Sequence, residues 1–299
     1  MNRWLLRVPL AAVLISAIAI GIAEAEQWIA QRVVGAVQTY QVLTFDSWQT
    51  IASRFGVDAR TVAADNGLTN AQPLRLGQLL RIDNRHIVPD AAARVSLVVN
   101  IPQRMLFFSD RTGISAYPIA AGRPTWRTPL GAFTVVTSER DPSWEVPQSI
   151  LEEARRKGKS LPPVVPPGPE NPLGQFWLGL SLGSVGIHGT NAPASIYRTV
   201  THGCIRLSPD DIEALFPRVN LGTTGEVIYE PILLAVDGDD VLLEAHPDVY
   251  RRTIGDPLAE VLRRAATLRI VDHLDSTAVA RVLKLREGVA RSVVKLASH

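Results

Sequence analysis

The sequence predicts a mainly β protein whose central body follows a small mixed α/β module and precedes a partly helical extension. Three observations support this fold class. Apolar residues from position 94 onward alternate with a period of two, which is typical of strands. Residues 40–83 show a strand–helix–helix–strand pattern. Residues 233–299 place apolar residues at helical spacing, as an amphipathic helix requires.

The composition of the chain indicates a globular protein and excludes several functional classes. Of its 299 residues, 46% are apolar and 20% are charged, which excludes a wholly disordered chain. Its 31 Lys and Arg residues and 29 Asp and Glu residues leave a net charge of +2, so we expect no nucleic-acid partner. A single cysteine excludes an intramolecular disulfide and any multi-cysteine zinc or iron–sulfur site.

The first 25 residues have the pattern of a secretory signal peptide. Arg3 and Arg7 precede an apolar run, Val8–Ala23, that ends at the small-x-small sequence Ala23-Glu24-Ala25. The run is shorter than the roughly 18 apolar residues expected of a membrane-spanning helix. We therefore expect an exported protein, cleaved after residue 25, that has no integral membrane segment. An uncleaved inner-membrane anchor is the alternative.

Residues 40–83 carry the signals of a compact module. A strand-like run begins at Tyr40, and a first helix follows that Gly56 ends. Asp58 caps a second helix that stops at Asn66-Gly67, and a closing strand comes after it. The order strand–helix–helix–strand is thus completed within a short stretch of chain.

This module resembles LysM, a family that binds glycans containing N-acetylglucosamine, such as peptidoglycan. The residues that carry the resemblance are Ile51-Ala52, Phe55-Gly56-Val57, Asn66-Gly67-Leu68, Leu76-Gly77-Gln78 and Leu80. The turn Phe45-Asp46-Ser47-Trp48 departs from the family's usual Gly-Asp-Thr-Leu, beside the sugar groove. The resemblance implies glycan binding, and a role as a spacer alone is the alternative.

Residues 94–232 begin with a hairpin pattern, because alternating apolar residues lead to the turn at Pro102-Gln103 and to the run Met105–Phe108. Further strand-like runs follow at Tyr117–Ala121 and Ala132–Thr137. A helical insertion near Gln148–Lys157 precedes a proline-dense loop, Leu161–Asn171. Because proline is excluded from central strands and helices, we expect this loop to be stiff and extended. It is either a lid over a cleft or an inert surface loop.

The single cysteine, Cys204, has neighbours that indicate a reactive thiol. His202 lies two residues before it, His188 sixteen before it, and Arg206 two after it. A histidine partner lowers the pKa of a thiol and makes it nucleophilic. Gly203 allows close approach of the backbone, whose N–H groups there can form an oxyanion hole. Arg206 supplies a guanidinium that suits a substrate carboxylate.

Two other interpretations of the same residues are structural or metal-binding. Cys204 could be a small buried residue in a structural cluster. His188, His202 and Cys204 could also be three zinc ligands, although their spacing is not typical of zinc sites.

The run Thr201-His202-Gly203-Cys204-Ile205-Arg206, preceded by His188-Gly189-Thr190-Asn191, closely resembles the signature of the L,D-transpeptidases, the YkuD-type catalytic domain. The likeness extends over about residues 94–232 and includes Asn100, Gly122, Thr128–Phe133 and the loop Pro162–Gly174. Thr201 stands where Ser is commoner, and Tyr197 stands where related sequences often have Gly.

The resemblance implies an antiparallel β-sandwich and a cysteine-dependent acyl transfer without cofactor or metal. Members of the family cut a peptidoglycan tetrapeptide stem after its third residue, release D-alanine and hold the stem as a thioester. By this resemblance Cys204 is the nucleophile and His188 is the general base. The backbone of His202 and Gly203 forms the oxyanion hole, and the His202 ring is a second candidate base. Arg206 anchors a stem carboxylate or supports the site, and Thr201 contributes a supporting hydroxyl.

We therefore expect a periplasmic L,D-transpeptidase that a LysM module docks to the wall. Its partners would be peptidoglycan stems and glycan strands, and an outer-membrane lipoprotein if the acceptor amine is a lipoprotein lysine rather than a stem amine. An L,D-carboxypeptidase or cross-link endopeptidase on the same site is one alternative. A non-catalytic LysM wall-binding protein is another. The extension at residues 233–299 has a basic helical face, which is either solvated or laid on an anionic surface.

Overall fold

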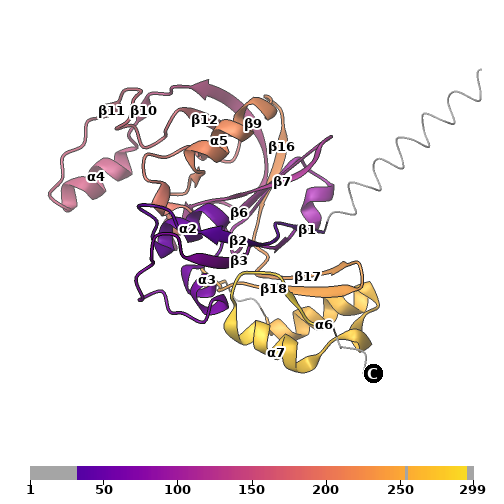
Figure 1. The fold of residues 1–299 in the computed structure, drawn as a ribbon. Coiled ribbons are helices and arrows are strands. Elements are labelled where there is room, and N and C mark those ends of the chain that lie inside the picture. The colour runs from indigo at the N-terminus through magenta and orange to yellow at the C-terminus, as the bar shows by residue number, and fades with distance from the viewer. Residues whose placement is uncertain (1–31, 253–254, 295–299) are drawn as a thin grey trace, which may run out of the picture.

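The computed structural model describes residues 32–252 and 255–294 (Figure 1). The predicted signal peptide, residues 1–25, lies outside this described part. Among the described helices, none combines the length and the apolar character that crossing a membrane requires.

The N-terminal module, β2 through β3, has the predicted element order. Its elements are β2 (Val37–Gln41), α2 (Trp48–Phe55), α3 (Ala59–Asp65) and β3 (Leu79–Asp83). Ser47 and Thr50 form a capping box at the start of α2. Gly56 ends that helix with a φ of 67°, a left-handed conformation that glycine adopts without strain. Strands β2 and β3 pair antiparallel and close the module.

A single curled sheet of eight strands forms the central body (Figure 1). Its order is β15-β13-β12-β9-β16-β5-β6-β7. The strands are β5 (Leu97–Asn100), β6 (Met105–Asp110), β7 (Gly113–Pro118), β9 (Gly131–Arg140), β12 (Phe176–Leu180), β13 (Gly186–His188), β15 (Ile205–Arg206) and β16 (Thr224–Ile228). Two further strands, β8 (Ala121–Gly122) and β14 (Thr199–Thr201), pair parallel beside it.

The main sheet differs from the expected antiparallel sandwich because two of its pairings are parallel. Strand β15 runs parallel to β13, and β16 runs parallel to β5. Each parallel partner returns after a long crossover, and β16 inserts between β5 and β9. The chain is therefore a mixed α/β fold with one curled sheet, a LysM-like module before it and helices at its C-terminal end.

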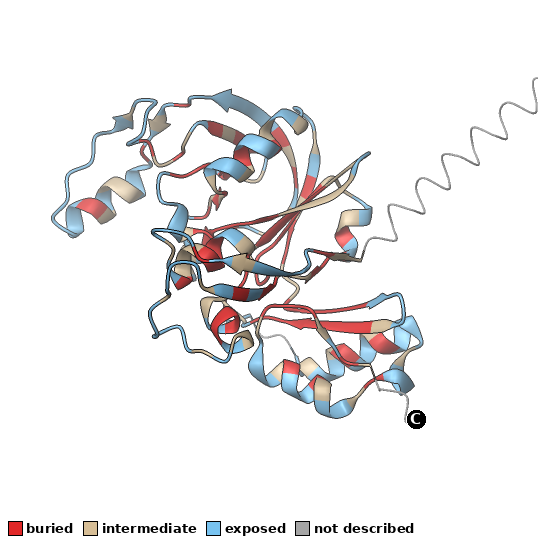
Figure 2. Cartoon of the chain, viewed as in Figure 1, coloured by how far each residue is buried: buried red, intermediate tan, exposed pale blue. Residues whose placement is uncertain are grey.

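Apolar residues of the central strands form the main core, and Figure 2 shows them as buried segments along the sheet. Helix α5 (Pro209–Leu215) covers this core with Ile212 and Leu215. Ser208 caps α5 by accepting from the Asp211 N–H, and Pro209 occupies its first turn. Only two residues separate this helix from β15, the strand that follows Cys204.

The predicted helical insertion is α4 (Gln148–Arg156). It is carried on an arm whose two edges, β10 (Trp144–Glu145) and β11 (Val164–Val165), pair antiparallel. The proline-dense segment is otherwise irregular, as its sequence predicts. In Figure 1 the arm extends from one end of the sheet.

The C-terminal unit, β17 through β19, is a hairpin covered by two helices. Its elements are β17 (Ile232–Asp237), β18 (Asp240–Ala245), α6 (Pro257–Leu268), α7 (Ser276–Leu285) and β19 (Arg291–Ser292). The two helices occupy the expected stretches, but helical spacing did not indicate the hairpin. Helix α7 also ends earlier than its apolar pattern suggests, because Ala290 and Val293 belong to the segment around β19.

Candidate active site

Two neighbouring strands bring the signature residues together. Strands β13 and β15 run parallel, with Ile187 opposite Ile205 and His188 opposite Arg206. Cys204 immediately precedes β15, so it lies at the end of the strand that pairs with the one carrying His188. The pairing explains why residues sixteen positions apart in the sequence share one site.

The imidazole of His188 is buried and held in one orientation. Its Nδ1 donates to the Gly189 carbonyl oxygen at 2.7 Å, and the Trp177 ring stacks on it with centroids 5.9 Å apart. This hydrogen bond places the ring proton on Nδ1 and leaves the lone pair on Nε2. Burial and the nearby Arg206 charge lower the pKa of His188 to about 3, although hydrogen bonds to the backbone of Gly189 and Leu173 act to raise it. The ring is therefore neutral in the resting site.

The thiol of Cys204 is protonated in the same resting site. Burial raises its pKa, while a backbone hydrogen bond from Gly186 and the charge of Arg206 act in the opposite direction. A protonated thiol and a neutral imidazole differ from a preformed thiolate–imidazolium pair. From these states, catalysis requires that Sγ give its proton to a base as the sulfur attacks an acyl carbon.

A tight turn fixes Cys204 between β14 and β15. The Thr201 hydroxyl donates to the Cys204 carbonyl oxygen at 2.6 Å and accepts from the Gly203 N–H at 3.2 Å. Gly203 has a φ of +112°, where a side chain would be strained. Since Thr201 engages the Gly203 N–H, that group is not free to bind an oxyanion in this state. The Cys204 N–H has no hydrogen-bond partner within the described residues.

Arg206 lies beside Cys204 with part of its guanidinium unpaired. Its Nη1 donates to the Ser195 hydroxyl at 2.9 Å, and its buried Nε finds no partner in the described part of the chain. Burial lowers the pKa of this guanidinium, which remains charged. The unpaired donor makes Arg206 suited to an anionic group of a ligand.

His202 points to the α4 arm instead of sharing a proton with Cys204. Its Nε2 donates to Glu153 Oε2 at 2.7 Å, and the Trp126 ring meets it edge-on at 4.2 Å between centroids. Glu153 also accepts from Arg123 and Lys157, both at 2.5 Å. These donors hold the pKa of Glu153 far below its usual range, and burial lowers the pKa of His202.

The sequence did not indicate Glu153, Arg123 or Trp126 as site residues. Glu153 and His202 are 49 residues apart in the chain, and Arg123 and His202 are 79 apart. Charged residues on an amphipathic helix are usually solvated, and no motif marks these. Only the fold of the arm brings them to the signature.

The zinc interpretation does not fit the observed contacts. His188 uses Nδ1 for a backbone carbonyl, and His202 uses Nε2 for Glu153. Within the described residues no group of three or more His, Cys, Asp and Glu side chains is arranged to hold a metal ion.

Comparison with known proteins agrees with this geometry. A family model of the L,D-transpeptidase catalytic domain matches residues 94–228, and a LysM domain model matches residues 40–83. The chain is 31% identical to the probable L,D-transpeptidase ErfK/SrfK of Salmonella typhimurium over 254 residues, which cover 81% of this chain and 80% of the relative. The chain belongs to the L,D-transpeptidase family.

A second relative extends the likeness along nearly the whole chain. The L,D-transpeptidase family includes the probable L,D-transpeptidase YcfS of Escherichia coli, to which the chain is 29% identical over 304 residues, covering 96% of this chain and 93% of the relative. This L,D-transpeptidase is thus a cysteine-dependent peptidoglycan enzyme with an N-terminal LysM domain. As a cell-wall enzyme it acts outside the cytoplasm.

The first turn of the LysM domain keeps a closed shape despite its unusual sequence. Asp46 accepts from the Leu43 N–H at 2.8 Å and from the Tyr40 hydroxyl at 2.5 Å. Trp48 Nε1 donates to the Gln72 carbonyl oxygen at 2.6 Å and so ties this turn to the loop after α3. The Phe45 side chain is almost fully exposed beside them. The turn thus combines these hydrogen bonds with an exposed aromatic side chain at Phe45, whose φ is 70°.

Proposed function

We propose that this L,D-transpeptidase acylates Cys204 with a peptidoglycan tetrapeptide stem and passes the stem to an amine in the periplasm. The Sγ–carbonyl bond forms at the third stem residue while the bond to D-alanine breaks, so a thioester and free D-alanine result. The observation that carries the proposal is the neutral His188, oriented through Nδ1 with its Nε2 lone pair available in the strand beside Cys204.

His188 and the turn at residues 201–204, here called the catalytic turn, have separate roles in the reaction. Nε2 of His188 takes the Sγ proton during attack and returns it to the departing amine of D-alanine. The Cys204 N–H is the oxyanion donor, in place of the Gly203 N–H that Thr201 engages. Arg206 binds a carboxylate of the stem through the charge of its guanidinium. His202 acts through its position, since its ring is hydrogen-bonded to Glu153.

The acceptor amine decides the final product. A diamino side chain of a neighbouring stem gives a 3→3 cross-link, and a lysine of an outer-membrane lipoprotein gives an attached lipoprotein. Water as acceptor makes the same site an L,D-carboxypeptidase. The LysM domain binds the glycan strands and brings the catalytic domain to its substrate.

The acyl-enzyme is the species that tests this proposal. The purified enzyme is mixed with disaccharide-tetrapeptide and quenched in acid, and its intact mass is measured. We expect a mass increase equal to the acyl group of the disaccharide-tripeptide, and none in Cys204→Ala. Carbapenem, which acylates the family's thiol, is the positive control. If neither compound adds mass to the wild type, the protein is a wall-binding module and the proposal is wrong.

A further inference from the structure

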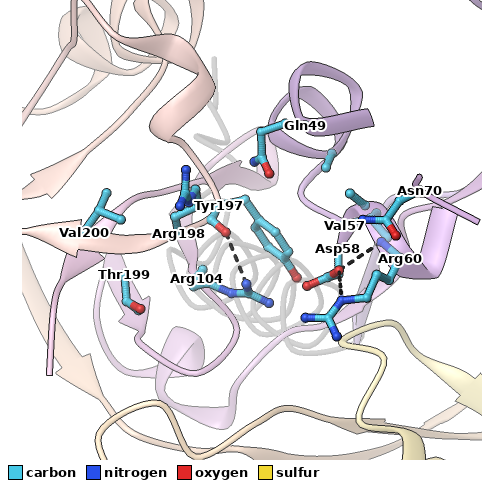
Figure 3. A pocket seen from close by; sticks show the side chains of 12 residues that line it. Gln49, Val57, Asp58, Arg60, Asn70, Arg104, Tyr197, Arg198, Thr199 and Val200 are labelled. Carbon is cyan, nitrogen blue, oxygen red and sulfur yellow. Dashed lines mark hydrogen bonds and ion pairs between the residues drawn. The ribbon is translucent and has the colours of Figure 1, made fainter. Parts of the chain in front are cut away.

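A polar pocket of about 370 Å³ lies where the LysM domain meets the catalytic domain (Figure 3). The LysM side supplies part of α2, the start of α3 with the two residues before it, and the loop that follows α3. The catalytic side supplies Arg104 from the β5–β6 turn and residues 197–200, which lead into β14. This pocket is separate from the LysM turn at Phe45–Trp48.

The charges that line the pocket favour an anionic ligand. Three guanidinium groups, of Arg60, Arg104 and Arg198, face one carboxylate, Asp58, so two positive charges are in excess. Asp58 and Arg60 approach to 3.9 Å. The Arg198 side chain is exposed and makes no hydrogen bond or ion pair with the residues that the structure describes. It is therefore available to a ligand.

Tyr197 forms a buried wall of the pocket. The residue is only 3% exposed, and its hydroxyl lies below the surface. Figure 3 shows Tyr197 and Arg104 on the catalytic side of the pocket and Asp58 and Arg60 on the LysM side. Tyr197 also has a φ of 61°, a left-handed conformation that is uncommon for a bulky residue and is typical of functional sites.

Arg104 lies over one face of the Tyr197 ring. Its guanidinium is 3.9 Å from the ring centroid, and its Nη1 donates to the Tyr197 carbonyl oxygen at 3.1 Å. Because the ring is only 3% exposed, it offers no surface on which a sugar can stack. The guanidinium groups that line the pocket instead match a carboxylate.

We infer that this pocket, the seam pocket, binds a carboxylate of a second peptide stem while another stem occupies Cys204. The inference rests on the proposed function, because a cross-linking enzyme must hold two stems of one polymer. Val200 precedes Cys204 by four residues, so at most about 14 Å of chain separates them. The seam pocket is thus joined to the catalytic turn by the short strand β14, and a bound stem would lie between the glycan-binding domain and the thiol.

The test measures peptide binding to enzyme whose catalytic thiol is already blocked. Carbapenem first acylates Cys204, and intact mass confirms full labelling, so failure at this step contradicts the proposed function and not the seam pocket. Free tetrapeptide stem is then titrated by calorimetry. We expect saturable binding that Arg198→Ala weakens about tenfold and Arg198→Glu weakens further, while Arg111→Ala, an exposed arginine outside the pocket, binds as the wild type does.

Two probes separate a carboxylate site from a sugar site. A tetrapeptide with amidated carboxyl groups should lose the binding, and a neutral N-acetylglucosamine tetramer should not compete with the peptide. Equal affinities of the wild type and the Arg198 variants would overturn the inference. Competition by the neutral sugar would also overturn it and assign the pocket to glycan. Circular dichroism of each variant checks that the fold is kept.

Discussion

Burial keeps the proton on Cys204 and off His188 for the same physical reason, since each charged form would lose the water that stabilises it. The thiol is therefore held in the protonated form. In the proposed mechanism it becomes nucleophilic only as it loses its proton to His188, and a protonated thiol is less open to side reactions than a thiolate. A hydrogen bond to the Gly189 carbonyl oxygen fixes the ring, and the Arg206 charge adds to burial in keeping it neutral.

The protonation state of Cys204 gives a prediction about ultraviolet absorbance. The difference spectrum between the wild type and Cys204→Ala should show no thiolate at neutral pH, because the folded-state pKa is raised above the ordinary value of about 8.5. Thiolate absorbance should appear only as the pH rises beyond that value. Because the pKa of His188 is about 3, kcat/KM should show no inflection near the ordinary histidine pKa of about 6.5. Thiolate absorbance at neutral pH would indicate an ion pair instead.

The two histidines should differ sharply when each is removed. His188→Ala should lower the rate of acylation by about a thousandfold, because general-base catalysis is lost. His202→Ala should keep measurable activity, because its Nε2 is hydrogen-bonded to Glu153 and does not serve Cys204. Acylation by disaccharide-tetrapeptide, followed by intact mass, gives both rates. A greater loss in His202→Ala would exchange the two roles.

Residue-level features of the site could be predicted where they lie in one local motif. Cys204, His188, Thr201 and Arg206 were predicted as a group, and the paired strands β13 and β15 show why such spacing works. The engagement of the Gly203 N–H by Thr201 could not be predicted, since a hydroxyl's partner depends on the turn's geometry.

At the scale of elements, the α4 arm is fastened to the catalytic turn by one carboxylate. The Glu153 carboxylate accepts hydrogen bonds from His202, Arg123 and Lys157 at 2.7, 2.5 and 2.5 Å, respectively. The arm carries the proline-dense loop, and Asn191 Nδ2 contacts the Glu170 carbonyl oxygen of that loop at 3.3 Å. The arm is therefore connected to the site at two points, through Glu153 of its helix and through the loop predicted as a candidate lid.

Substitution of Glu153 should loosen the arm without unfolding the protein. Glu153→Gln removes the charge that its three donors share, so amide hydrogen exchange in residues 148–156 should accelerate several-fold. The rate of Cys204 acylation should fall as well. Glu152→Gln, next along the helix and bonded only to Gln148, is the control and should leave both unchanged. Equal exchange rates in the two variants would show that Glu153 does not fasten the arm.

Strand existence could be read from the sequence, but strand order could not. The period-two runs at Met105–Phe108 and Ala132–Thr137 fall within β6 and β9. Local alternation says nothing of which strand lies beside which, so the parallel pairing of β5 with β16 was not foreseen. The hairpin β17–β18 did have a signal, since Gly238 separates two apolar runs, but helical spacing further on obscured it.

At the scale of the molecule, a buried carboxylate joins the LysM domain, the catalytic domain and the C-terminal unit. Glu244 of β18 accepts from the Ile87 N–H at 2.6 Å, from Gln103 Nε2 at 3.1 Å and from two histidines. One of these, His86, also contacts the Gly56 carbonyl oxygen of the LysM domain at 2.9 Å. The C-terminal unit thus acts as a brace, and Arg291 adds ion pairs to the LysM domain.

Glu244 should make stability fall in acid. Burial raises the pKa of Glu244, but His86 and His246 lower it by more, so the pKa is about 2 in the folded state. A depressed folded-state pKa contributes stability above the ordinary carboxyl pKa of about 4.3 and loses it as the pH falls toward 2. Urea unfolding should show Glu244→Gln less stable than the wild type by about 3 kcal/mol at neutral pH. The difference should shrink below about pH 4, and a pH-independent difference would contradict this role.

Transfer of peptidoglycan stems from Cys204 to an amine can be measured directly. Purified enzyme and Cys204→Ala are each incubated with disaccharide-tetrapeptides, and the products are resolved by liquid chromatography with mass spectrometry. We expect a new dimer, lighter than two monomers by one D-alanine, that is absent with the variant. Tripeptide alone would mean that water or an amine missing from the mixture takes the acyl group. A dimer that persists in Cys204→Ala, or no product with either protein, would contradict transfer by Cys204.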